Sequence, residues 1–131
     1  MEERVKAAPK PYGLSDMMLA DFHQLFSRFP AIREVWIYGS RARGDHGPAS
    51  DIDLAVVAPA MNDSQFAKMC WLLEDLPVLY QVDILHWDTL ENAPLKKAIQ
   101  SERKPFYPQI TAQAHERVSD DRDLLFPLTR A

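Results

Sequence analysis

Two aspartates with one residue between them are the first feature of this sequence that suggests chemistry. Asp51 and Asp53 flank Ile52 at the head of an apolar run. Because successive side chains of a strand alternate between its faces, both carboxylates would project from one face and Ile52 from the other. Two neighbouring carboxylates repel each other unless a cation lies between them. Mg²⁺ is the expected cation, because it prefers oxygen ligands and is commonly held by carboxylates together with substrate phosphates.

A turn suited to phosphate binding precedes these aspartates. Gly39 follows an apolar run and lets the backbone approach a ligand closely. The residues from Ser40 to Arg43 favour a helix. The free backbone N–H groups at the start of this helix would face an anion at Ser40. Arg41 or Arg43 would offset the charge of a phosphate. The sequence therefore predicts a phosphate site next to a metal site.

A third acidic residue lies in a later apolar run. Asp83 is flanked by Val82 and Ile84. A charge in a buried strand is unfavourable without a partner, so this residue also favours a functional role. Taken alone, Asp51 would fit a cap at the start of a strand or in a loop, and Asp53 an ion pair with one of the arginines. The three together favour metal binding.

These residues resemble a known family. Gly39-Ser40, ten further residues, Asp51-x-Asp53 and then Asp83 resemble the DNA polymerase β-type nucleotidyltransferase superfamily. The Gly-Ser-Arg-Ala-Arg-Gly sequence and the short chain resemble its minimal nucleotidyltransferases, the MntA-like antitoxins of HEPN/MNT toxin–antitoxin pairs. The resemblance extends over about residues 14–107.

The resemblance implies a reaction and a partner. A hydroxyl would attack the α-phosphorus of ATP in line, with two Mg²⁺ ions as cofactors. Asp51 and Asp53 would hold the metal on the triphosphate, and Asp83 would complete the second metal site and accept the hydroxyl proton. Gly39 and Ser40 would hold the terminal phosphates. The implied acceptor is a tyrosine of a HEPN-domain toxin. A non-catalytic antitoxin that blocks its partner by binding, and transfer to a small-molecule hydroxyl, are the alternatives.

The hydrophobic pattern predicts an α/β (α+β) domain with a small mixed sheet and helices packed against it. The expected strands are Glu34 to Tyr38, Asp51 to Val57 and Val78 to His86. The short link between the first two favours antiparallel pairing, and the helix between the second and third requires a parallel crossover. Helices are expected after the N-cap residues Ser15, Asn62 or Asp63, and Asp88 or Thr89.

Length and composition fit one globular domain. Hydrophobic residues make up 47% of the 131 residues, charged residues 26%, and the net charge is -4. Without a broad basic surface, long nucleic acid is not an expected partner. We also expect no membrane span and no signal peptide, and the single cysteine suits a cytoplasmic protein. Residues 1–13 are expected to be an irregular lead-in, 14–107 the domain, and 108–131 a tail that is either unstructured or docks a partner. The aromatic residues are expected in the core rather than stacked on a base: Trp36, Tyr38, Trp71 and Trp87.

Overall fold

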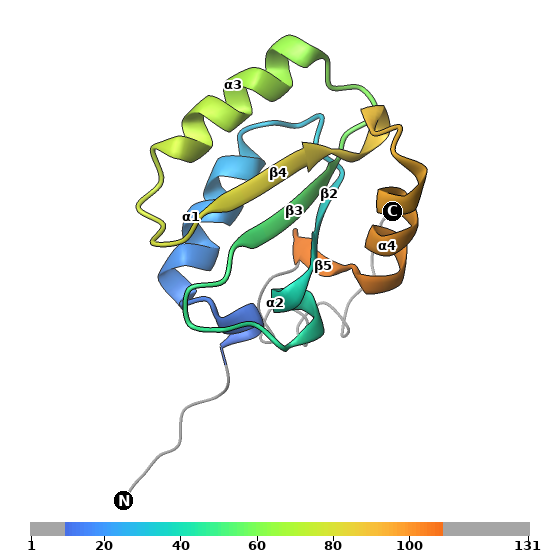
Figure 1. Cartoon of the computed structure of the whole chain (residues 1–131). Helices are drawn as coiled ribbons and strands as arrows, with labels where there is room; N and C mark the ends of the chain where they lie inside the picture. Colours follow the sequence, from blue (N-terminus) through green and yellow to red (C-terminus); the bar gives the residue numbers. More distant parts are fainter. Residues whose placement is uncertain (1–9, 109–131) are drawn as a thin grey trace, which may run out of the picture.

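The computed structural model describes residues 10–108, which form one mixed sheet with helices on both of its faces (Figure 1). In chain order the elements are η1 (Pro11–Gly13), α1 (Asp16–Ser27), β2 (Glu34–Tyr38), α2 (Ser40–Arg43), β3 (Ile52–Val57), α3 (Asp63–Glu74), β4 (Val82–His86), η2 (Trp87–Thr89), α4 (Ala93–Glu102) and β5 (Lys104–Tyr107).

The sheet has four strands in the order β4-β3-β2-β5. Strand β2 pairs antiparallel with both β3 and β5, whereas β3 pairs parallel with β4. The parallel connection runs through α3, as a crossover between parallel strands requires. The predicted fold class, the short antiparallel link and the crossover are confirmed.

The edge strand β5 was not predicted from the sequence. Its four residues include Pro105, which lacks an N–H donor and is tolerated only at a sheet edge. A register shift between Val35 and Trp36 further disturbs its pairing with β2. Phe106 is nevertheless completely buried, so the strand contributes to the core.

Two predicted strand starts were too early. Strand β3 begins at Ile52 rather than Asp51, and β4 begins at Val82 rather than Val78. The parallel pairing explains both boundaries, because the first register pair joins Ile52 to Val82. Just before this pair, the Ile52 N–H donates to the carbonyl of Gln81 at 2.8 Å. The apolar residues from Val78 to Tyr80 therefore belong to the connection between α3 and β4.

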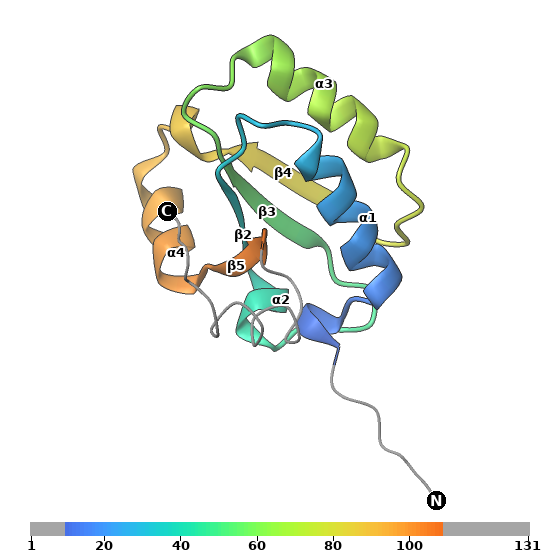
Figure 2. The same ribbon diagram turned by 180° about the vertical axis from the view of Figure 1, so that it is seen from behind.

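One face of the sheet carries the main core. Alternate side chains of β2 and β3 are completely buried there: Val35, Ile37, Ile52, Leu54 and Val56. They pack against helices α1 and α3, which lie together on this face (Figure 2). Burying a side chain of this size contributes roughly 1.5–3 kcal/mol, so this face supplies most of the hydrophobic stabilisation.

The opposite face has a smaller core under α4. Trp36, Ala55 and Ile99 are its buried members. Helix α4 lies beside β2 and β5 (Figure 1). Asp53 and Asp83 occupy the same face as Ala55, because residues two apart in a strand share a face.

Polar side chains fix the helix starts. Ser15 accepts a hydrogen bond from the Met18 N–H at 3.2 Å, as predicted for an N-cap. Asn62 caps α3 in a reciprocal pair with Gln65. The prediction for α4 was wrong: its cap is Asn92, which accepts from the Leu95 N–H at 3.0 Å.

Two local features explain the late start of α4. Asp88 and Thr89 belong instead to the short helix η2. Pro94 lies in the first turn of α4, where a missing N–H has no cost, so it begins the helix rather than kinking it. None of the helices within residues 10–108 is long and apolar enough to span a membrane.

The aromatic residues differ in their surroundings. Trp36 is buried and makes an edge-on contact with Trp87, with ring centroids 4.9 Å apart. The expectation of a core position was wrong for Trp71, whose exposed fraction is 73%. Its place in α3 lies outside the stripe of Met69 and Leu73 that faces the sheet.

Candidate active site

The parallel register of β3 and β4 brings two of the predicted acids together. Asp53 lies directly opposite Asp83 in this pairing. On its other side, Asp53 lies opposite Tyr38 of β2. The three side chains therefore form a row across three neighbouring strands, on the face that α4 shares.

The acids form a cluster of like charges. Burial raises the pKa of Asp53, and the negative charges of Asp83 and Asp51 raise it further, together with a side-chain hydrogen bond to Asp83. Asp51 and Asp83 are exposed, whereas Asp53 is only partly so. This difference places Asp53 at the inner end of the cluster and the other two carboxylates toward solvent.

Tyr38 is a site residue that the sequence analysis assigned to the core. Burial raises the pKa of its hydroxyl to about 12, and the nearby carboxylates contribute to this shift. Those carboxylates are Asp53, Asp83 and Glu102. The alternation of β2 was the available signal, because a residue opposite Asp53 must share its face.

Gly39 joins the end of β2 to the site and cannot readily be another residue. Its φ of 77° and ψ of -157° lie in a region that L side chains rarely adopt. A Cβ atom at this position would also collide with Oδ2 of Asp53. The glycine therefore permits both the turn and the close approach of the carboxylate.

Helix α2 follows at once and is only one turn long. It begins at Ser40 and ends before Gly44, which has a φ of 91° and whose N–H donates to the Ser40 carbonyl at 2.9 Å. Gly44 in this left-handed conformation ends the helix, as glycines commonly do.

The two arginines of α2 have different environments. Arg41 has an exposed fraction of 3%. Its Nε and Nη2 donate to the carbonyl of Ser50 at 3.1 and 2.9 Å, and its Nη1 donates to that of Tyr12 at 2.9 Å. Its guanidinium also lies 4.3 Å from the ring centre of Tyr80. These contacts favour a positioning role for Arg41 over the phosphate contact that the sequence predicted.

Arg43 instead points toward solvent and carboxylates. Its Nε pairs with Asp45 at 3.2 Å, and its Nη1 pairs with Glu102 at 3.1 Å. Solvent access and a guanidinium at the rim of the cluster keep Arg43 as a candidate phosphate contact.

Glu102 is a second residue that the sequence analysis missed. It is the last residue of α4, yet its Oε1 accepts the N–H of Gly39 at 3.1 Å. Only the fold brings it there, since the two residues lie 63 positions apart. A polar residue at the end of a helix gives no signal of such a contact.

The carboxylates fit a hard divalent cation by their chemistry. Asp53 and Asp83 already converge, and Asp51 lies near enough for its charge to raise the Asp53 pKa. Oxygen donors of this kind suit Mg²⁺. Within residues 10–108, no three His, Cys, Asp or Glu side chains are arranged as a finished metal site.

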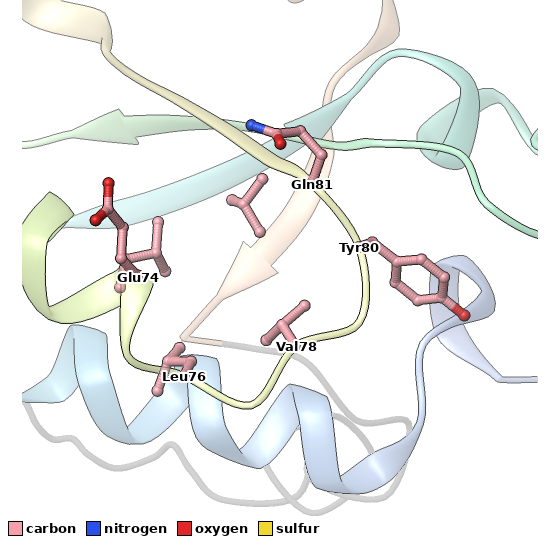
Figure 3. A pocket seen from close by; sticks show the side chains of 7 residues that line it. Glu74, Leu76, Val78, Tyr80 and Gln81 are labelled. Carbon is pink, nitrogen blue, oxygen red and sulfur yellow. The ribbon is translucent and has the colours of Figure 1, made fainter.

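A separate cleft of about 330 Å³ lies at the connection between α3 and β4 (Figure 3). Glu74, Leu76, Val78, Tyr80 and Gln81 surround it in the close view, together with Leu73 and Val82. None of the predicted site residues lines this cleft, so it is distinct from the carboxylate cluster.

Several solved structures share this fold. A toxin–antitoxin crystal structure with AMP-PNP has a TM-score of 0.56 and 20% identity, over 76% of this chain and 78% of that chain. Two structures of mutant MntA-HpeT toxin–antitoxins each have a TM-score of 0.54. Their identities are 17% and 20%, over 76% and 79% of this chain and over 78% and 79% of theirs. At these identities the similarity shows the fold alone.

Sequence comparison gives a firmer assignment. No curated protein matched the sequence. The family model described as "Polymerase beta, Nucleotidyltransferase" matches residues 21–110, which include the Gly39 turn and all three aspartates. The chain therefore belongs to the polymerase β nucleotidyltransferase family.

Proposed function

We propose that this protein transfers AMP from ATP to a hydroxyl of a toxin partner and thereby acts as its antitoxin. The observation that carries the proposal is the register pairing of Asp53 with Asp83, next to the turn that Gly39 permits. Family membership supports nucleotidyl transfer as the reaction. The choice of ATP, of a protein acceptor and of Mg²⁺ is the further step of this proposal.

The three carboxylates have distinct proposed roles. Asp51, Asp53 and Asp83 would hold Mg²⁺, which would supply positive charge to the triphosphate and to the oxygens exchanged in an in-line displacement. Asp83 is exposed, so an acceptor hydroxyl can approach it from solvent. It accepts the proton of that hydroxyl as the oxygen bonds to the α-phosphorus and pyrophosphate leaves. Asp53 lies deeper and adjoins the Gly39 turn.

The turn and one arginine hold the phosphates in this proposal. The backbone at Gly39 and Ser40 donates N–H groups to phosphate oxygens, while the missing Cβ of Gly39 leaves room for the Asp53 carboxylate beside the turn. Arg43 offsets the negative charge from the solvent side. Arg41 holds the loop before β3 in place through Ser50 and has no direct phosphate contact.

The proposed partner is a HEPN-domain toxin with an acceptor tyrosine. Resemblance to the minimal nucleotidyltransferases supports this choice. The three similar structures described above are toxin–antitoxins, and one of them contains AMP-PNP. Modification of the toxin by AMP would silence it, whereas a blocking antitoxin would need only to stay bound.

Two measurements test the proposal. Titration calorimetry with ATP should show binding with Mg²⁺ and much weaker binding with EDTA, because the carboxylates repel a triphosphate without a cation. ATP labelled at the α-phosphate should then label a candidate HEPN protein. Asp75→Asn, an exposed change outside the cluster, is the matched control and should behave as wild type. Equal affinity with and without Mg²⁺ would contradict the metal-bridged site.

A further inference from the structure

The carboxylate of Glu102 holds two groups of the proposed phosphate site at once. Its Oε1 accepts the Gly39 N–H at 3.1 Å, and its Oε2 accepts Nη1 of Arg43 at 3.1 Å. The side chain is partly buried, with an exposed fraction of 28%. It therefore lies at the rim of the carboxylate cluster, beside Arg43.

These two contacts are those that a phosphate oxygen would make. A backbone N–H and an arginine N–H both donate, and an anion accepts from each of them. The charge of Glu102 also contributes to the raised pKa values of Tyr38 and Asp53, so it lies within electrostatic range of the acids. A triphosphate and the Glu102 carboxylate cannot occupy the same donors together.

We propose that Glu102 takes the place of a phosphate group in the nucleotide-free protein, so that ATP must displace it to bind. This inference rests on the proposed function, because it concerns the same turn and the same arginine. Displacement frees Nη1 of Arg43 for the phosphate, while Asp45 still holds Nε of that arginine. Glu102 thereby sets the affinity for nucleotide and selects a ligand with enough charge and bound metal to compete with a carboxylate.

The physical size of the effect follows from one unit of charge. At an effective dielectric constant between those of protein and water, a like charge a few ångströms from a phosphate weakens binding by roughly tenfold. Glu102→Gln removes the charge and keeps the shape. It should therefore bind Mg·ATP roughly ten times more tightly than wild type.

The experiment is calorimetric titration of Mg·ATP into wild type, Glu102→Gln and Glu102→Ala. Glu91→Gln is the matched control, since it removes the same charge from an exposed residue just before the start of α4 and should leave the affinity unchanged. The gain from Glu102→Gln should shrink in an Arg43→Ala background, because part of it comes from releasing this arginine. Glu102→Ala shows whether tighter binding comes from the loss of the carboxylate or from a new hydrogen bond made by the glutamine amide.

The outcomes separate this inference from the proposed function. If wild type binds ATP with Mg²⁺ and both Glu102 variants bind equally or more weakly, Glu102 only positions the turn or ligates metal, and the displacement idea is overturned. If wild type binds no ATP even with Mg²⁺, the proposed function fails and this inference fails with it. Tighter binding by both variants, with Glu91→Gln unchanged, supports displacement.

Discussion

The two faces of the sheet use the same strands for opposite purposes. On the face toward α1 and α3, Ile52 and Leu54 are completely buried among apolar side chains. On the other face, Asp53 lies between them in sequence but opposite Asp83 in space. Consecutive residues of β3 thus have opposite effects. Leu54 stabilises the fold by burial, whereas Asp53 is repelled by the neighbouring Asp83.

The comparison shows how a small domain can place like charges side by side. The apolar face fixes the register of β3 against β4, because a slip by one residue would turn the buried side chains to the other face. That register determines the separation of the carboxylates. The core therefore provides the rigid support that a catalytic constellation needs.

The largest expected effect is on the acid face. Asp83→Asn should keep the fold and much of the ATP binding, yet lower AMP transfer by about 10²- to 10⁴-fold, because the amide cannot accept the hydroxyl proton. Asp53→Asn should impair both binding and transfer, since this carboxylate lies deeper and adjoins Gly39. Label transfer and partner activity should be measured separately for each variant. If Asp83→Asn silences the partner as well as wild type does, the protein acts by occlusion rather than catalysis.

The next change breaks the opposite face. Leu54→Ala should lower the free energy of unfolding by about 2–5 kcal/mol, because it leaves a cavity in the main core. Urea denaturation followed by circular dichroism measures it. The neighbouring change Asp53→Asn should cause no such loss. A loss below about 1 kcal/mol for Leu54→Ala would show that this face is not the main source of stability.

A third prediction compares the two arginines of α2. Arg41→Ala should lower the free energy of unfolding by about 2–3 kcal/mol, because the buried carbonyls of Tyr12 and Ser50 lose their donors. Lysine should not restore the loss, since it cannot reproduce the planar fork of donors.

Arg43→Ala is the matched comparison on the same turn. It should leave the unfolding midpoint nearly unchanged, because the side chain is exposed and its ion pairs are screened. Its effect should appear instead as weaker ATP binding in calorimetry. If Arg41→Ala weakened ATP binding without loss of stability, the phosphate role expected from the sequence would apply to Arg41 after all.

The sequence was informative where the signal was local. Alternation and apolar spacing located β2, the body of β3 and helix α1, and the need for a crossover predicted the parallel pairing that aligns Asp53 with Asp83. The start of α4 was placed too early because Asp88 and Thr89, which precede Asn92, are also favoured N-cap residues. The structure uses Asn92, which accepts from the Leu95 N–H. Proline in β5 obscured a strand that exists only through its pairing with β2.

Long-range contacts were beyond such patterns. Glu102 reaches Gly39 because α4 ends beside the turn, and no local rule indicates that meeting. The burial of Arg41 depends on the carbonyl of Tyr12, which arrives from a distant segment. His23 of α1 likewise packs against Tyr107 of β5, with ring centroids 5.1 Å apart.

The smallest expected effect is on the melting temperature, because the ionised carboxylates on the acid face destabilise the folded chain. Burial and the neighbouring carboxylates raise the pKa of Asp53 above its ordinary value, so its ionised form is less favourable in the folded chain than in the unfolded one. A raised pKa contributes stability below the unfolded value of about 4, and this contribution is lost as pH rises through the folded value. In metal-free buffer near pH 7, Asp53→Asn should therefore raise the melting temperature, by a few degrees at most because solvent screens the partly exposed site.

The pH and metal dependence of that shift identify its cause. The advantage of Asp53→Asn should fade as pH falls through the raised pKa of Asp53, because the wild-type carboxyl is then protonated in the folded chain. Mg²⁺ should raise the melting temperature of wild type more than that of the variant. An ion that binds only the folded state stabilises that state, and the variant lacks one of the carboxylates that would bind the ion. Thermal melts at several pH values, with EDTA or Mg²⁺, provide the measurement, with Asp75→Asn as the control. A lower melting temperature for Asp53→Asn in EDTA at pH 7 would mean that Asp53 helps to hold the fold together, and the division of labour between the two faces would then be wrong.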